Sequence, residues 1–147
     1  MIHGTVLHVE DDPGVSQFVQ KALRTFTIES APNGLVALKA LQTGSDRFRL
    51  VILDLVLPVM NGLEVYAALR QRPETATLPV LVTTGSFVTP NEFAGDALVT
   101  VLRKPFHVDQ LRNAVDQLLL RLPLAAPATP ATGGGALSRI RAVFGKG

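Results

Sequence analysis

The stretch VILDLVLPVMNG at residues 51–62 constrains the fold of this 147-residue chain more than any other. It begins as an unbroken apolar strand that ends in a carboxylate, Asp54, and the turn residues Pro58 and Gly62 then lead into a new helical pattern. A continuous apolar strand is typical of a parallel sheet that is covered on both faces. Because open α/β sheets bind ligands at the carboxyl ends of their strands, Asp54 is the first candidate site residue.

Short apolar runs alternate with amphipathic stretches along residues 1–122. The pattern predicts strands at residues 4–9, 26–30, 50–54, 79–84 and 98–102. It predicts helices at residues 13–25, 34–43, 63–72 and 107–121, and a weak, short fourth helix near 90–97. Five such units indicate an α/β fold with a doubly wound, five-stranded parallel sheet of order 2-1-3-4-5.

The composition excludes several classes of protein. The chain has no Cys, which rules out disulfides and thiolate metal sites. No apolar run approaches the length of a membrane span, and the first residues lack the pattern of a signal peptide, so a cytoplasmic protein is expected. Residues 1–122 carry 11 Lys or Arg and all 12 Asp and Glu, so the basic balance comes from residues 123–147. No direct contact with nucleic acid is therefore expected.

The predicted domain ends at residue 122, and the pattern then changes twice. Residues 123–136 are rich in Pro, Ala, Thr and Gly, which is typical of a linker. Residues 137–147 read as a short basic amphipathic tail, with Leu137, Ile140, Val143 and Phe144 on one helical face and Arg139 and Arg141 off it. The tail is interpreted either as a disordered appendage or as a segment that docks on an acidic partner or an anionic lipid surface.

Charged and hydroxyl side chains follow the predicted strands at one edge of the sheet. Glu10, Asp11 and Asp12 come directly after the first strand, and Asp54 ends the third, its neighbour in the predicted order. Clustered carboxylates repel one another, and Mg²⁺ favours such a group together with water and phosphate oxygens. Thr84 closes the fourth strand and Lys104 follows the fifth, which supplies a hydroxyl donor and a cation for phosphoryl oxygens. The set predicts a nucleophilic aspartate acting on phosphorus.

These motifs resemble those of the receiver domains of bacterial two-component response regulators. The matching stretches are VEDD at 9–12, LDLVLPVMNG at 53–62, PVLVTT at 79–84 and RKPF at 103–106, in the order of the family. The resemblance covers residues 1–122 and implies a flavodoxin-like receiver fold of the stand-alone, single-domain type.

The resemblance also implies a role for each matching residue. Asp54 would be the phosphoacceptor. Glu10, Asp11, Asp54 and the backbone carbonyl of Val56 would hold Mg²⁺ or Mn²⁺, whereas Asp12 is interpreted as a helix cap. Thr84 and Lys104 would contact the phosphoryl group, with a cis bond before Pro105. Thr83, one residue earlier, is the rival of Thr84.

One position, Val101, departs from the usual sequence pattern of the family. Two others, Val56 and Ser86, would by the resemblance influence how long the phosphoryl group survives. Val101 stands where the family usually has an aromatic switch residue, which Phe87 or Phe93 could replace. Val56 and Ser86 occupy the two positions that tune the lifetime of the phosphoryl group, and Val56 cannot orient a water, so slow self-dephosphorylation is expected. His8 lies inside the first strand and is expected to be a core or half-buried histidine with satisfied nitrogens rather than a ligand.

The resemblance implies a signalling phosphoacceptor rather than an enzyme, although one that assists its own phosphorylation and dephosphorylation. Its partners would be a histidine kinase or phosphotransfer protein and a downstream protein target. A homodimer through the surface of helix 4, strand 5 and helix 5 is compatible with the family. Two alternatives stay open: a receiver-like adaptor that works through its tail without phosphorylation, and a phosphatase-type hydrolase, which would usually keep a D-x-D motif after the first strand.

Overall fold

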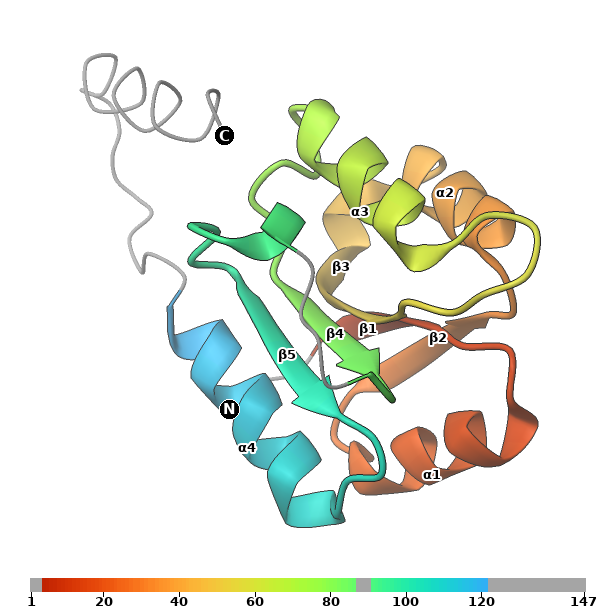
Figure 1. Ribbon diagram of the computed structural model, residues 1–147, viewed down its shortest axis with the longest axis vertical. Coiled ribbons are helices and arrows are strands. Elements are labelled where there is room, and N and C mark those ends of the chain that lie inside the picture. The colour runs from red at the N-terminus through yellow and green to blue at the C-terminus, as the bar shows by residue number, and fades with distance from the viewer. Residues whose placement is uncertain (1–3, 87–90, 122–147) are drawn as a thin grey trace.

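The computed structural model describes residues 4–86 and 91–121, in which five parallel strands form one sheet of order β2-β1-β3-β4-β5 (Figure 1). This is the predicted order. The strands are β1 (Thr5–Val9), β2 (Thr27–Ala31), β3 (Phe48–Asp54), β4 (Val80–Thr84) and β5 (Val99–Arg103). The helices are α1 (Pro13–Ala22), α2 (Gly34–Gln42), α3 (Gly62–Gln71) and α4 (Val108–Leu120), with 3-10 turns η1 (Ser45–Arg47) and η2 (Asn91–Phe93).

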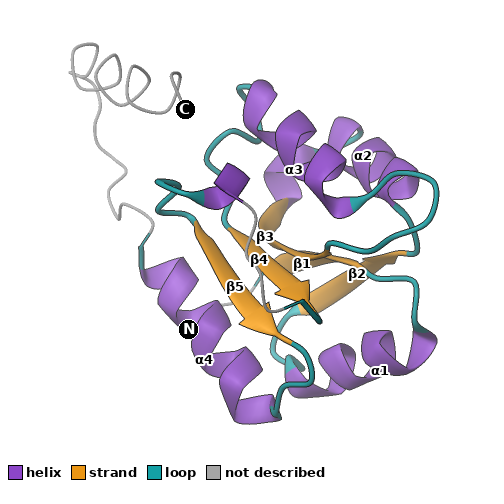
Figure 2. Ribbon diagram, in the orientation of Figure 1, coloured by secondary structure: helices purple, strands orange, loops and turns teal. Residues whose placement is uncertain are grey.

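The sheet lies between two helical layers, each with its own core. Helices α1 and α4 cover one face and α2 and α3 cover the other (Figure 2). Residues of one strand alternate between the two cores, so that Val6 packs toward α1 and α4 while Leu7 packs toward α2 and α3. Strand β3, at the centre, is buried at every position except Arg49. Its burial on both faces explains the unbroken apolar run in the sequence.

Side chains at the helix starts fix where each helix begins. The Asp12 carboxylate accepts hydrogen bonds from the backbone N–H groups of Gly14 and Val15, at 2.7 and 3.3 Å, which caps α1. Asn33 caps α2 in the same way. Asn61 and Glu64 form a reciprocal capping box at the start of α3. The predicted cap at Asp12 is therefore present.

The segment between β4 and β5 differs most from the prediction. The weak fourth helix expected near residues 90–97 is reduced, among the described residues, to the single turn η2. Gly95 adopts φ +83°, a conformation that ends any right-handed helix there. Phe93 is buried in the core on the α2 and α3 face. Packing of this aromatic ring, rather than a regular helix, holds the segment against the domain.

Smaller differences concern element ends. Strand β3 begins at Phe48, two residues before the predicted start, and α1 ends at Ala22, three residues before the predicted end. Phe87 and residues 123–147, with the predicted linker and tail, lie outside the described residues. Within the described ranges, no helix is both long enough and apolar enough to cross a membrane.

Candidate phosphoacceptor site

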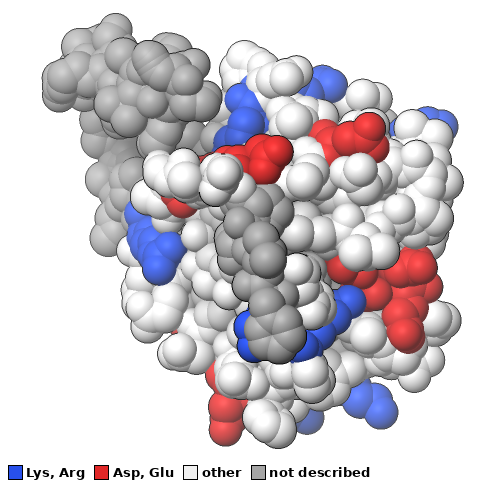
Figure 3. Space-filling model, viewed as in Figure 1, with Lys and Arg blue, Asp and Glu red and all other residues white. Residues whose placement is uncertain are grey.

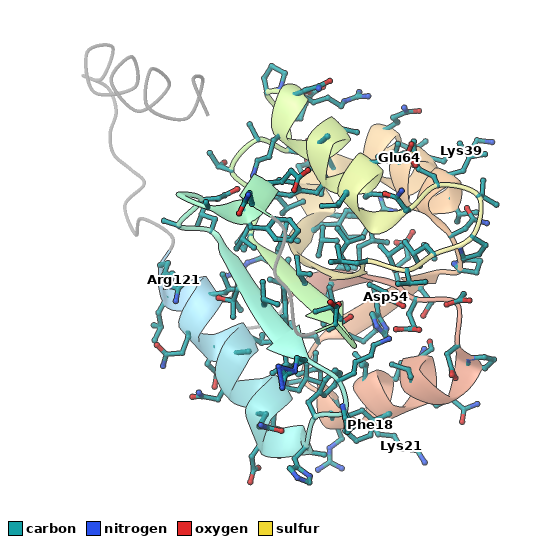
Figure 4. The ribbon with its side chains drawn as sticks, viewed as in Figure 1. Phe18, Lys21, Lys39, Asp54, Glu64 and Arg121 are labelled. Atoms are coloured by element: carbon teal, nitrogen blue, oxygen red, sulfur yellow. The ribbon has the colours of Figure 1, made fainter. Side chains whose placement is uncertain are left out.

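Three carboxylates meet at the carboxyl end of the sheet. Glu10 and Asp11 follow β1, and Asp54 is the last residue of β3, the strand that pairs with β1. One carboxylate oxygen from each of these side chains lies within 4.8 Å of the other two. Glu10 and Asp54 are buried, whereas Asp11 is exposed. Asp54 lies near the centre of the view in Figure 4. The strand order thus brings together residues separated by more than forty positions in the sequence.

The side chain of Lys104 lies between two of these carboxylates. Its Nζ donates to Glu10 Oε1 at 3.1 Å and to Asp54 Oδ2 at 3.2 Å. Its backbone N–H donates to the carbonyl oxygen of Thr84 at 2.7 Å, which ties the loop after β5 to the end of β4. The bond between Lys104 and Pro105 is cis, the isomer expected from the resemblance. The predicted acids and the predicted lysine therefore share one site.

Burial and neighbouring charges in this cluster shift the pKa values of Glu10 and Lys104. Burial raises the pKa of Glu10 above its usual value of 4.5, and the neighbouring charge of Asp54 raises it further. Burial alone would lower the pKa of Lys104, but the charges of Asp54 and Glu10 outweigh that effect, and the pKa is raised. Three carboxylates thus face one ammonium group. A hard divalent cation with oxygen ligands fits this excess of negative charge.

A tight loop holds Asp54 in place. The backbone N–H of Val56 donates to Asp54 Oδ1 at 3.2 Å, while the carbonyl oxygen of Leu55 accepts from Gly62 N–H at 3.0 Å. A Cβ atom at Gly62 would lie only 2.4 Å from the carbonyl oxygen of Asp54, so the loop requires glycine there. The backbone of Val56, the predicted fourth metal ligand, belongs to the same loop.

Two threonines compete for the role of the hydroxyl donor. Thr84 is buried at the end of β4, and its Oγ1 accepts a hydrogen bond from the Ser86 N–H at 3.0 Å. Thr83 is the residue of β4 that pairs in register with Asp54, and its buried Oγ1 has no hydrogen-bond partner among the described residues. The choice of Thr84 over Thr83 therefore stays a prediction.

Val101, at the expected aromatic position, is half-buried and pairs with Val82.

His8 does not match its expectation. The ring is buried as predicted, but both nitrogens lack a hydrogen-bond partner in the described part of the chain, so the expectation of satisfied nitrogens is wrong. Burial lowers its pKa to about 4, and the nearby charge of Lys104 contributes to the shift. The sequence shows only that His8 lies in a strand, and it does not indicate that the ring nitrogens lack partners.

Sequence reasoning also missed a polar network near the amino ends of β4 and β5. Asp96 accepts hydrogen bonds from the Tyr66 hydroxyl and from Arg70 Nε, at 2.5 and 2.8 Å, and Arg70 also donates to the carbonyl oxygen of Leu78. The Tyr66 ring packs edge-on against Phe93, with ring centroids 4.8 Å apart. The network ties the segment between β4 and β5 to α3. Asp96 lies 26 residues after Arg70 and 30 residues after Tyr66, so no local sequence pattern predicts these hydrogen bonds.

Comparison with known proteins finds a family model and curated relatives that resemble this chain. The family model for the response regulator receiver domain matches residues 6–116. The response regulator ArlR of Staphylococcus epidermidis is 33% identical over 127 residues, 80% of this chain and 53% of that protein. The transcriptional regulatory protein TcrA of Mycobacterium tuberculosis is 31% identical over 128 residues, 84% of this chain and 49% of that protein. The chain thus spans about half the length of these curated relatives.

Solved structures share the fold of this chain. The chemotaxis protein CheY4 of Vibrio cholerae matches with a TM-score of 0.70 and 28% identity, covering 80% of this chain and 99% of that chain. The signal receiver domain of a histidine kinase from Syntrophus aciditrophicus matches with a TM-score of 0.70 and 26% identity, covering 87% of this chain and 98% of that chain. Both similarities extend over most of residues 4–121.

Proposed function

Because the chain belongs to the family of response regulator receiver domains, we propose that it accepts a phosphoryl group on Asp54 and passes the signal on by protein contact. One observation carries the proposal. The Asp54 carboxylate is buried, is paired with Lys104 at 3.2 Å and lies beside the Glu10 and Asp11 carboxylates. A nucleophilic carboxylate, a cation and a divalent-ion site are the groups that phosphoryl transfer to an aspartate needs.

Each residue has a distinct task in this proposal. An oxygen of Asp54 attacks the phosphorus of the donor, and the donor's leaving group departs in line. Lys104, already held between Glu10 and Asp54, supplies positive charge to the transferred phosphoryl oxygens. The hydroxyl of Thr84 donates to another of these oxygens. Glu10, Asp11, Asp54 and the Val56 carbonyl would hold Mg²⁺ or Mn²⁺, which neutralises charge on the phosphoryl group when bound.

The phosphoryl donor in this proposal is a histidine kinase or a phosphotransfer protein in the cytoplasm. Residues 1–122 act as the receiver, and the tail beyond the linker is a separate element. The family assignment and the similarity to single receiver domains such as CheY4 support output through contact with a downstream protein. New charge at the sheet edge would act on the loops that surround Asp54.

The surroundings of Asp54 also support a long-lived phosphoryl group. Val56 is among the most exposed large hydrophobic residues of the described chain, and its side chain offers no group to position an attacking water. Ser86 is tied through its backbone to Thr84. We expect Val56→Asn to speed dephosphorylation, measured by phosphoprotein decay after removal of the donor; an unchanged rate would contradict this interpretation.

The proposed function is tested with acetyl phosphate and Mg²⁺. Intact-mass spectrometry and peptide mapping should show one phosphoryl group on Asp54, and none after chelation of the metal or in Asp54→Asn. Asp11→Asn should slow the reaction, because it removes a metal ligand. Asp12→Asn is the matched control, since it changes the adjacent exposed acid while an Asn still caps α1. Modification of another residue, or full modification of Asp54→Asn, would refute the assignment.

A further inference from the structure

Four of the five large hydrophobic side chains that are exposed in the described residues lie in two segments, the first turn of α2 and the loop that follows Asp54. Leu35 and Val36, in the first turn of α2, are 52% and 40% exposed, and Val56 and Val59, in the loop between β3 and α3, are 77% and 75% exposed. Leu120 is the one other large hydrophobic residue that is exposed in the described ranges. We refer to Leu35, Val36, Val56 and Val59 as the apolar patch.

The two halves of the patch belong to segments in direct contact. The start of α2 touches the loop closely, because a Cβ atom at Gly34 would lie 2.5 Å from the carbonyl oxygen of Met60. Val59 adopts φ +68°, an unfavourable conformation for a β-branched residue. The chain therefore keeps an exposed valine where Asn or Gly would fit with less strain. Exposed apolar surface of this kind is typical of binding sites.

Acidic groups border the apolar patch. The backbone N–H of Val56 donates to Asp54, whose carboxylate lies within the cluster that includes Asp11. Asp11 and Asp12 are exposed. Figure 3 shows acidic side chains gathered between the loop after β3 and helix α1, with an uncharged surface above them. A ligand for this region would combine apolar side chains with positive charge.

Residues 137–147 of the same chain have that composition. Leu137, Ile140, Val143 and Phe144 fall on one face of a helical projection, and the segment carries Arg139, Arg141 and Lys146 with no acid. An amphipathic segment this short is marginal as a helix in water unless it packs on a surface. The acidic border disfavours an anionic membrane as the occupant of the patch, because like charges would meet there.

We propose that residues 137–147 dock on the apolar patch of their own chain, with Arg139 and Arg141 facing Asp11 and Asp12. The 14 residues 123–136 reach up to about 45 Å when extended, more than the about 30–35 Å diameter of a domain of this size. Tethering makes docking an intramolecular step, which raises the effective concentration of the segment at the patch above that of a separate peptide. The docking itself does not depend on phosphorylation.

A spin label tests the proposal in the full chain. Because the chain has no Cys, Ala142→Cys supplies a single thiol at a position outside the four apolar ones. A spin label attached to this thiol should reduce the amide NMR intensities of the four patch residues at least twofold relative to a diamagnetic label at the same position. Ile140→Ser with Phe144→Ser should restore those intensities, and so should Val56→Ser with Val59→Asn. Leu120→Ser is the matched control on an exposed apolar residue elsewhere and should change nothing.

Three results would overturn the proposal. The first is broadening that is uniform over the domain. The second is broadening at the patch that survives both double variants. The third is broadening that appears equally when unlabelled ¹⁵N-protein is mixed with spin-labelled ¹⁴N-protein, since the occupant would then be a second copy.

Discussion

Replacing Lys104 by methionine tests the electrostatics of the site most sharply. The ammonium group lies 3.1 Å from a Glu10 oxygen and 3.2 Å from an Asp54 oxygen, and the two acidic side chains are only 2% and 6% exposed. At an effective dielectric constant of 20, each contact is worth about 5 kcal/mol before desolvation. Desolvation offsets most of this gain, and water reaches the lysine side chain, which is 26% exposed. We therefore expect Lys104→Met to lower the free energy of unfolding by about 2–3 kcal/mol at pH 7, below the full cost of breaking a buried pair.

A double-mutant cycle with Asp54→Asn separates this effect from lost packing. The amide removes the charge that repels Glu10, so the loss caused by Lys104→Met should shrink by at least about 1 kcal/mol in the double variant. Urea unfolding followed by circular dichroism measures all four proteins. Lys39→Met, on the exposed face of α2 (Figure 4), is the control and should stay within about 0.5 kcal/mol of the parent. A change at Lys104 no larger than at Lys39, or purely additive effects in the cycle, would refute the reasoning.

Further predictions concern the network of Tyr66, Arg70 and Asp96 and the loop that holds Asp54. Tyr66 is the one tyrosine of the chain; burial and the hydrogen bond to Asp96 raise its pKa to about 12, so phenolate absorbance should titrate near pH 12 and shift downward in Asp96→Asn. Because the folded-state pKa exceeds the usual 10.0, Tyr66 stabilises the fold fully below pH 10, and that contribution is lost as pH rises through about 12. A midpoint near 10 would show that the hydroxyl is exposed. Gly62→Ala should cost more than about 2 kcal/mol in thermal or urea unfolding, since its Cβ would overlap backbone atoms, whereas Gly85→Ala, with open space around it, should be nearly neutral. Equal effects of the two substitutions would contradict the description of the loop.

Much of the fold could be predicted because its signals are local. The apolar run before Asp54 marks a strand buried on both faces, and Asp12 before Pro13 marks a helix start, as the structure confirms. The acid cluster could be predicted for a topological reason. Once β1 and β3 are neighbours in a parallel sheet, residues at their carboxyl ends must lie close together.

The features that could not be predicted depend on contacts between distant residues. The turn that replaces the weak fourth helix is held by Phe93 against Tyr66, and neither residue indicates the other in the sequence. Both ring nitrogens of the buried His8 lack a hydrogen-bond partner among the described residues, which a strand pattern does not reveal. The sequence also does not predict that Val56 and Val59 are exposed, because an apolar residue in a loop is ordinarily expected to pack against the domain.

In the proposed function, the carboxylates of Glu10, Asp11 and Asp54 form a single pocket with Lys104 for a divalent ion and a phosphoryl group. The most direct test is amide NMR of the full chain, titrated first with Mg²⁺ and then with beryllofluoride, which mimics a phosphoryl group. The account predicts that Mg²⁺ shifts the signals of Asp11 and Val56, and that beryllofluoride, only when Mg²⁺ is present, adds shifts at Thr84 and Lys104. A folded protein whose spectrum is unchanged by both reagents, or whose shifts lie away from the carboxyl end of the sheet, would contradict it.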